Sequence, residues 1–169
     1  DNLEQLSDEA FRARFREWLQ AHYPPALRQD FRRPFRRLRG DDARSWLNGQ
    51  ITNDVRELAG DEARYALALT AKGRIVTDLW ALAESEGMAI VLPRARLEAA
   101  LERFDKHIIM EDVALQTDEA LAVITVQGPR AEAVIAWASA AVRRYPCARL
   151  GGIGFDCWVP RDAVADTLA

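Results

Sequence analysis

The chain has 169 residues, of which 49% are hydrophobic and 29% are charged, and its formal net charge is −3. These values are ordinary for a globular protein that is either one domain with a core or one domain plus an appendage, and the charge favours neither nucleic acid nor a membrane surface. No apolar run approaches the roughly 20 residues that cross a bilayer, and no basic segment followed by an apolar one indicates export.

The first segment predicts an amphipathic helix over residues 3–21. Ser7 is a candidate N-cap, and large apolar residues follow at helical spacing, namely Phe11, Phe15, Trp18 and Leu19. Pro24-Pro25 ends this helix, because proline cannot continue it. An arginine-rich stretch over 28–39 follows, which indicates a solvated linker or an edge strand with charged residues, or alternatively a surface that contacts phosphates.

The pattern changes at about residue 36. A short helix is predicted at 43–48, followed by strands at 64–70, 74–83 and 88–92. Lys72-Gly73 is a plausible tight turn between the first two strands, because glycine accepts the positive φ that such turns need. A helix is predicted from 94 to about 107, and another over 130–143. Further strands are predicted at 113–116, 121–126 and 155–159.

Helices and strands mix here without the regular alternation of a doubly wound sheet, and hairpins are frequent. We therefore expect an α+β fold with a mixed, largely antiparallel sheet and helices on one side. Two parts are predicted: 1–35 as an N-terminal helix and arginine-rich linker, and 36–169 as the α+β domain. We expect this domain to be truncated at its C-terminal end, in a chain that is a piece of a longer protein.

Six motifs occur in order along the second part. They are Gly-Asp-Asp-Ala at 40–43, Leu-Asn-Gly-Gln-Ile-Thr-Asn-Asp at 47–54, the Tyr-Ala-Leu and Lys-Gly-Arg-Ile hairpin at 65–75, Asp-Lys-His-Ile-Ile-Met-Glu-Asp-Val at 105–113, Val-Gln-Gly-Pro-Arg-Ala at 126–131 and Gly-Phe-Asp-Cys-Trp-Val-Pro at 154–160. This order resembles the first domain of the folate-binding aminomethyltransferase superfamily. The closer relatives are YgfZ-type folate-binding proteins linked to iron–sulfur cluster repair and tRNA modification. The T-protein of the glycine cleavage system is more distant.

Three features differ from that family. The chain stops before the downstream Lys-Gly-Cys-x-x-Gly-Gln-Glu motif on which YgfZ-type activity is thought to depend. Residues 91–95 stand where the T-protein has an asparagine-containing segment. The first 35 residues resemble instead the N-terminal helix of an acyl-CoA dehydrogenase, which suggests a composite chain.

The resemblance implies a tetrahydrofolate site with Asp78 as its catalytic residue. Asp78 matches the aspartate that lies near the folate nitrogen in the T-protein, where a carboxylate can stabilise a developing iminium or move a proton. The alternative is an exposed strand acid paired with Arg64 or Arg74. Tyr65 matches a tyrosine of the pterin pocket, where an aromatic face suits a flat heterocycle. The alternative for Tyr65 is a core aromatic.

Asn53 and Asp54 are the other candidates for contact with the cofactor. Their side chains can hydrogen-bond a pterin edge, but Asn-Asp after a helix is also a common turn that satisfies its own backbone. His107 and Glu111 are four residues apart and could share a helix face, yet no further His or Cys supports a metal site. Cys147 and Cys157 are too few for a disulfide framework, so we expect reduced thiols in the cytoplasm.

Three functions are compatible with the residues. The first is a folate-binding domain of the YgfZ type, with iron–sulfur proteins as partners and no direct contact with nucleic acid. The second is an aminomethyltransferase of the T-protein type, although the chain alone should turn over little because relatives close the pocket with later segments. The third is a scaffold module without catalysis. Lys72-Gly73-Arg74 favours the first, since the T-protein usually has Asn-x-Gly-Gly there.

Overall fold

The computed structural model describes residues 10, 13, 14, 17, 35–135, 143–149 and 151–164. The chain divides into two units, Asp1–Phe31 and Arg32–Ala169. In the first unit the four described residues are helical. The rest of the predicted helix over 3–21, including Ser7, lies outside the described residues, as does Pro24-Pro25. The division into an N-terminal segment and an α+β domain stays a prediction.

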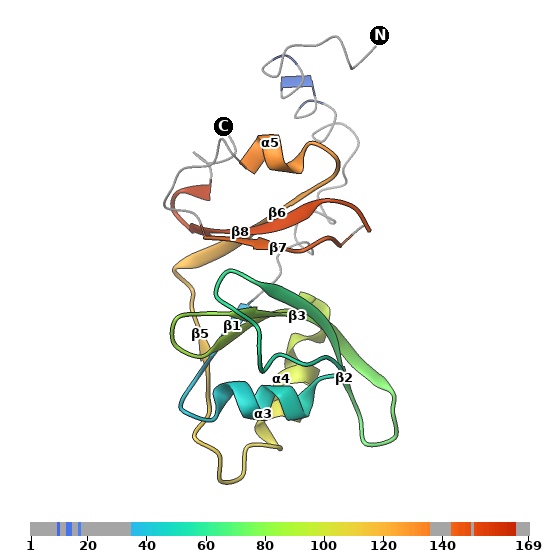
Figure 1. The fold of residues 1–169 in the computed structure, drawn as a ribbon, viewed down its shortest axis with the longest axis vertical. Coiled ribbons are helices and arrows are strands. Elements are labelled where there is room, and N and C mark those ends of the chain that lie inside the picture. The colour runs from blue at the N-terminus through green and yellow to red at the C-terminus, as the bar shows by residue number, and fades with distance from the viewer. Residues whose placement is uncertain are drawn as a thin grey trace. The chain divides into compact units, whose positions relative to one another are not determined.

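The second unit contains eight strands and four helical segments among its described residues (Figure 1). In chain order they are β1 (Phe35–Arg39), α3 (Ala43–Gln50), β2 (Ala63–Leu69), β3 (Ile75–Ala83), β4 (Met88–Val91), the 3₁₀ helix η2 (Arg94–Arg96), α4 (Leu97–Asp105), β5 (Ala114–Thr117), β6 (Leu121–Gln127), α5 (Ala131–Ile135), β7 (Arg143–Pro146) and β8 (Gly154–Pro160).

The strands form two antiparallel sheets. One has five strands in the order β2-β3-β4-β1-β5, and the other has three in the order β6-β8-β7. The predicted α+β class with antiparallel pairing is confirmed. Within the described residues no helix combines the length and the apolar character that crossing a membrane requires.

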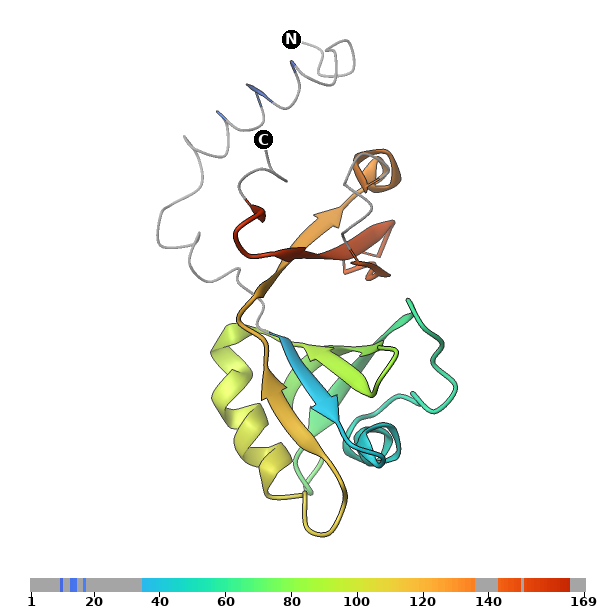
Figure 2. The same ribbon diagram turned by 90° about the vertical axis from the view of Figure 1, so that its left-hand side faces the viewer.

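Helices α3 and α4 cover one face of the five-stranded sheet (Figures 1 and 2). Alternate residues of β3 and β4, such as Leu79 and Ile90, point to this face and are fully buried. They meet Trp46 of α3 and Phe104 of α4, whose rings pack edge to face with centroids 5.7 Å apart. Trp46 also donates its indole N–H to the carbonyl of His107 at 2.9 Å. This layer forms the main hydrophobic core.

The opposite face of the larger sheet packs against the smaller sheet. Phe35 of β1 lies 4.4 Å from Trp158 of β8, and Tyr145 of β7 lies 5.3 Å from the same ring, measured between centroids. The Tyr145 hydroxyl donates to the carbonyl of Ala83 at 3.3 Å, and burial raises the pKa of this phenol. Helix α5 covers the outer face of the smaller sheet through Ile135. The described elements of the second unit therefore form layers of helices, sheet, sheet and helix.

The turn between β2 and β3 is the one predicted at Lys72-Gly73. Gly73 has a φ of +74°, and its N–H donates to the carbonyl of Thr70 at 2.9 Å. The N–H of Thr70 donates in turn to the carbonyl of Arg74 at 2.8 Å. This hairpin sets the register in which the candidate site residues face one another.

Strand β1 corrects the interpretation of the arginine-rich stretch. Residues 35–39 are neither a linker nor an edge strand, because β1 lies between β4 and β5 in the sheet. Two of its three arginines, Arg37 and Arg39, form ion pairs with carboxylates. Glu84, whose side chain is 1% exposed, pairs with Arg37 at 3.2 Å and with Arg39 at 3.1 Å. Arg37 also pairs with Asp118 at 2.5 Å.

The predicted helix over 130–143 is wrong at its end. It is helical at Ala131–Ile135, but Arg143–Pro146 forms strand β7. Arg143 of this strand reaches Glu84 at 3.0 Å, so the buried carboxylate joins both sheets. The residues between these two elements lie outside the described part of the chain.

Candidate functional site

Tyr65 and Asp78 lie on the same face of the larger sheet. In the β2–β3 ladder, Tyr65 is opposite Trp80 and Leu67 is opposite Asp78. Because side chains alternate between the faces of a strand, these four point to one side. That side is the one away from α3 and α4, so the hairpin places an aromatic pair and a carboxylate together.

Tyr65 is not a core aromatic. Its side chain is 46% exposed, and its ring packs against Trp80 with centroids 5.6 Å apart and an interplanar angle of 63°. Such edge-to-face packing supports the ring while it leaves an aromatic face open to a ligand. The alternative drawn from the sequence, burial in the core, is therefore wrong.

Asp78 is half-buried on β3. Its main-chain carbonyl accepts the Thr77 hydroxyl at 2.8 Å, but in the described part of the chain no hydrogen bond or ion pair engages its carboxylate. Arg64, one of the two partners considered from the sequence, donates instead to the main-chain carbonyl of Asp54 at 3.2 Å. The carboxylate is available to a ligand on this face.

Asn53 and Asp54 form a turn that is fastened to β2. The Asn53 amide donates to the carbonyl of Tyr65 at 3.1 Å, and its oxygen accepts the N–H of Asp54 at 2.9 Å. Asp54 pairs with Arg56 at 2.5 Å, and the hydrogen bonds from Arg56 lower the Asp54 pKa to about 2. These contacts agree with the interpretation of Asn53-Asp54 as a turn whose side chains hydrogen-bond its own backbone. Asn53 also fixes the backbone at Tyr65, while a contact of either residue with a cofactor stays a prediction.

Two residues beside this face were not identified from the sequence. Trp80 could have been identified, because it follows Asp78 by two positions along β3 and must therefore lie on the same face of the strand. Arg149 could not, since it follows β7, which is far away in the sequence. Its guanidinium carbon lies 5.5 Å from the centroid of the Trp80 ring.

A separate depression of about 720 Å³ lies on the helical side of the sheet. It lies among the end of α3, the tip of the β2–β3 hairpin and α4, and it is lined among others by Gln50, Thr70, Arg103, Lys106 and His107. Arg103 donates to the carbonyls of Leu69 at 2.7 Å and Gln50 at 3.2 Å. None of the predicted site residues lines this depression.

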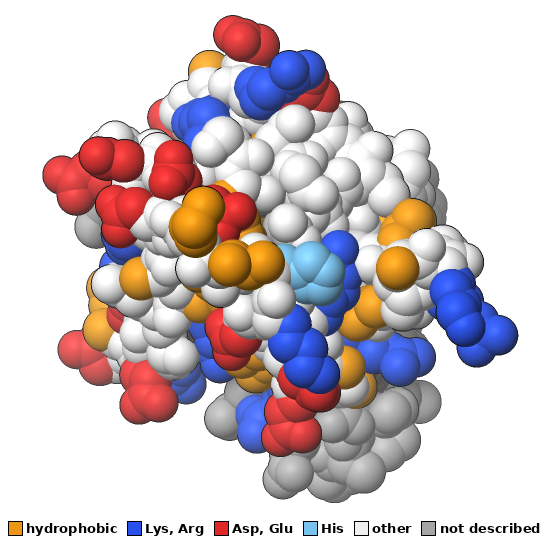
Figure 3. Space-filling view, turned by 90° about the horizontal axis from the view of Figure 1, so that it is seen from below, with side chains coloured by type: hydrophobic (Ala, Val, Ile, Leu, Met, Phe, Trp, Pro, Cys, Tyr) orange, Lys and Arg blue, Asp and Glu red, His pale blue; other side chains and the backbone are white. Residues whose placement is uncertain are grey.

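His107 and Glu111 do not face a common ligand. His107 Nδ1 lies 2.6 Å from the carbonyl of Arg103, whereas Glu111 accepts the N–H groups of Ile109 and Met110 at 2.9 and 3.0 Å. Glu111 thereby holds a loop that exposes two apolar side chains, and Figure 3 shows hydrophobic groups beside charged ones on this side of the protein. The described residues contain no group of three side chains suited to a metal ion.

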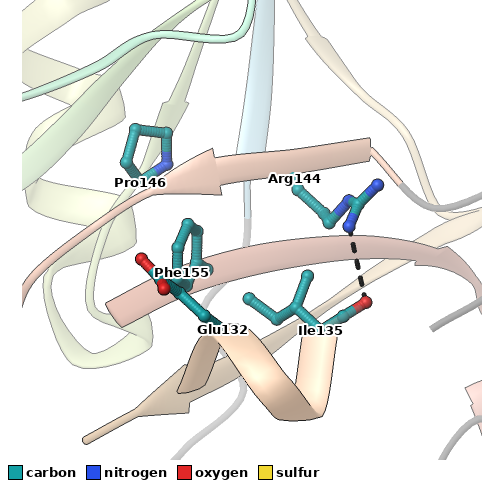
Figure 4. Close-up of a pocket in the computed structure, with 5 residues that line it drawn as sticks. All are labelled: Glu132, Ile135, Arg144, Pro146 and Phe155. Atoms are coloured by element: carbon teal, nitrogen blue, oxygen red, sulfur yellow. Dashed lines mark hydrogen bonds between the residues drawn. The ribbon is translucent and has the colours of Figure 1, made fainter. Parts of the chain in front are cut away.

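A smaller pocket of about 290 Å³ lies between α5 and the smaller sheet (Figure 4). Its walls include Ile135, Pro146 and Phe155, and Arg144 donates to the carbonyl of Ile135 at 3.4 Å. Its lining is mainly apolar, and it contains no predicted site residue.

Both cysteines are buried and unpaired as thiols. Burial raises the pKa of Cys147 and of Cys157, so the thiolate, which is the nucleophilic form, is disfavoured at neutral pH. Neither thiol is a candidate catalytic group.

Comparison with known proteins identifies the family to which the chain belongs. A sequence model described as "GCVT N-terminal domain" matches residues 35–148, which is more than half of the chain. The chain belongs to this family. Both Tyr65 and Asp78 lie inside the matched region, as do Asn53 and Asp54.

The GCVT N-terminal domain is similar to parts of two kinds of curated protein. An aminomethyltransferase of Chromobacterium violaceum is 35% identical over 95 residues, covering 56% of this chain and 26% of the relative. One of Chloroherpeton thalassium is 31% identical over 101 residues, covering 58% and 28%. The tRNA-modifying protein YgfZ of Escherichia coli is 27% identical over 99 residues, covering 59% and 30%. The match therefore spans less than a third of each curated relative.

A solved structure shares the fold of the domain. Glycine cleavage system aminomethyltransferase T from Bartonella henselae superposes with a TM-score of 0.69 at 20% sequence identity. The similarity covers 80% of this chain and 43% of that one. The resemblance to an aminomethyltransferase first domain is confirmed. The resemblance of residues 1–35 to an acyl-CoA dehydrogenase helix stays a prediction, because the family match begins at residue 35.

Proposed function

We propose that the outer face of the β2–β3 hairpin binds tetrahydrofolate, in a protein that acts in iron–sulfur cluster maintenance and the associated tRNA modification. One observation carries the proposal: an exposed Tyr65 ring and the unengaged carboxylate of Asp78 stand on the same face, inside the region that matches the family. An aromatic surface beside one polar group suits a flat, polar heterocycle such as a pterin.

Each residue of the proposed site has a separate role in binding the ligand. Tyr65 stacks on the pterin, and Trp80 supports the Tyr65 ring through their T-shaped contact. Asp78 accepts a hydrogen bond from the ligand or stabilises positive charge near a folate nitrogen. Asn53 and Asp54 hold the neighbouring turn, and Asn53 ties this turn to the backbone of Tyr65. Proteins that carry iron–sulfur clusters are the partners that this function implies.

A second candidate is one-carbon transfer with Asp78 as acid and base. Relatives named as aminomethyltransferases, at 31% and 35% identity, support it, and so does the absence of any described ion pair at the Asp78 carboxylate. Lys72-Gly73-Arg74 at the hairpin tip favours the YgfZ type instead. Robust methylene-tetrahydrofolate production from an aminomethyl donor, measured above a boiled control, would favour this second candidate over the first.

Calorimetric titration of the full chain with tetrahydrofolate tests the binding site. We expect a dissociation constant on the order of 0.1–1 mM, because the face is open to solvent on one side. Tyr65→Ala should weaken binding by roughly 1 kcal/mol through the lost stacking surface. Asp78→Asn should weaken it as well while the fold is kept, since the amide preserves the shape of the carboxylate.

Val134→Ala provides a control, because Val134 is 44% exposed, much as Tyr65 is, but belongs to α5 on the smaller sheet and not to the hairpin. It should leave the affinity unchanged. Equal losses in the control and in Tyr65→Ala would refute the assignment of the face. If titration of the wild-type chain with tetrahydrofolate releases no heat of binding, the result would favour the scaffold function.

A further inference from the structure

A buried ion pair of the smaller sheet reaches toward the proposed ligand face. Asp156 of β8 is fully buried, and its carboxylate accepts both the Arg149 guanidinium and the Thr125 hydroxyl. Arg149 Nε lies 3.3 Å from Asp156 Oδ1, Arg149 Nη2 contacts Oδ2, and Thr125 Oγ1 lies 2.9 Å from Oδ1. Only 10% of the Arg149 side chain is exposed. The guanidinium is therefore held in one orientation.

The main chain of Arg149 is fixed as well. Gln127 of β6 accepts the N–H of Arg149 at 2.9 Å and donates to the carbonyl of Cys147 at 2.8 Å. Gly154 leaves room for this amide, since a Cβ at that position would lie 2.1 Å from Gln127 Oε1. Two strands thus brace the loop that carries Arg149.

The fixed guanidinium lies over an aromatic ring of the other sheet. Its central carbon is 5.5 Å from the Trp80 centroid, a distance typical of cation–π contacts. Trp80 in turn packs against Tyr65 in a T-shaped arrangement. A continuous series of contacts therefore runs from buried Asp156 through Arg149 and Trp80 to the exposed ring of Tyr65.

We infer that Arg149 is a positioning residue, which holds Trp80 so that Tyr65 presents its ring to the ligand at a fixed tilt. The identity of the ligand in this inference, tetrahydrofolate, rests on the proposed function. A buried ion pair gives little net stability compared with apolar residues of similar size, so stability alone does not account for it. An aromatic wall that is fixed before binding loses less rotamer freedom when the ligand arrives, and this raises affinity.

The double variant Arg149→Met/Asp156→Leu separates positioning from stability. It removes both charges together, so neither is left buried without a partner, and it should unfold cooperatively near the wild-type midpoint. The Trp80 ring loses its cation, however. With 5-fluorotryptophan in the full chain, we expect the ¹⁹F resonance of Trp80, assigned through Trp80→Phe, to shift and broaden. Tetrahydrofolate affinity should fall three- to tenfold.

Two further variants complete the test. Arg144→Met removes an arginine of β7 that bonds the carbonyl of Ile135, and it should change neither the Trp80 resonance nor the affinity. Arg149→Lys keeps a charge opposite Asp156 but loses the planar group over Trp80. It should preserve the fold and shift the Trp80 resonance by a smaller amount, which keeps the test valid if the double variant does not fold.

An unchanged Trp80 resonance in the folded variants would overturn the inference, and so would wild-type affinity in the double variant. If the wild-type chain binds no tetrahydrofolate, the proposed function fails. The Trp80 resonance would then still decide whether Arg149 positions the ring, because that measurement needs no ligand.

Discussion

Replacing Glu84 with glutamine should destabilise the protein, because this buried carboxylate pairs with arginines of both sheets. The side chain is 1% exposed and pairs with three arginines, namely Arg37, Arg39 and Arg143. Two of them belong to β1 of the larger sheet and one to β7 of the smaller sheet. Glu84→Gln keeps the shape of the side chain but leaves three guanidinium groups around a neutral amide.

The size of the effect follows from burial. Breaking a buried ion pair by removing one partner costs about 3–5 kcal/mol. Here the arginine side chains are 22%, 28% and 50% exposed, so water screens them in part. We therefore expect the free energy of unfolding to fall by about 2–3 kcal/mol, with Arg143 contributing least because exposed pairs are worth little.

Urea unfolding followed by tryptophan fluorescence measures this loss. Glu102→Gln is the control, because Glu102 pairs with Lys106 at 2.6 Å on the exposed surface of α4 and should give no measurable loss. The urea midpoint of Glu84→Gln should fall while the slope stays constant. Equal midpoints for the two variants would refute the argument that a buried carboxylate joins the sheets.

The remaining predictions concern two glycines of the backbone and the two thiols. Gly87→Ala should cost roughly 2 kcal/mol or more in unfolding free energy, since its φ is +88° and a Cβ would lie 2.1 Å from the carbonyl of Leu38. A Cβ at Gly49 in α3 would meet nothing within 4 Å, so Gly49→Ala should raise the unfolding free energy by about 0.5–1 kcal/mol. Changes of the same sign for the two glycine variants in urea unfolding would contradict this reasoning. Above the ordinary thiol pKa of 9.0 the free energy of unfolding should fall, because the raised pKa values of Cys147 and Cys157 keep protons that the unfolded chain loses. Iodoacetamide should label both thiols only in urea, and fast native labelling would disprove their burial.

The sequence predicts the elements whose apolar residues alternate clearly. Strand β3 contains buried Leu79 and Leu82 on opposite faces, and Gly73 marks the turn before it. Strand β1 escapes detection because only Phe35 and Leu38 of its five residues are buried, and the intervening arginines resemble a surface segment. Two of the arginines of β1, Arg37 and Arg39, pair with Glu84, which the fold brings from another hairpin.

The candidate site also has features that the local sequence pattern predicts and others that depend on tertiary contacts. Once the turn at Gly73 is known, period-two alternation predicts that Tyr65 and Asp78 share a face. The contact between Tyr65 and Trp80 follows from the register of the β2–β3 ladder, whereas the exposure of Tyr65 depends on how the two sheets pack. The approach of Arg149 depends on contacts between segments far apart in the chain, which no local pattern contains.

The most direct test of the account is a two-dimensional ¹H–¹⁵N NMR titration of the full chain with tetrahydrofolate. We expect progressive shifts at the amides of Tyr65 and Asp78 and at the indole N–H of Trp80, with saturation at millimolar ligand and loss of these shifts in Tyr65→Ala. Shifts confined to Gln50, Arg103 and His107 around the depression on the helical side, or a spectrum that does not respond, would contradict the central claim that this face of the β2–β3 hairpin binds folate.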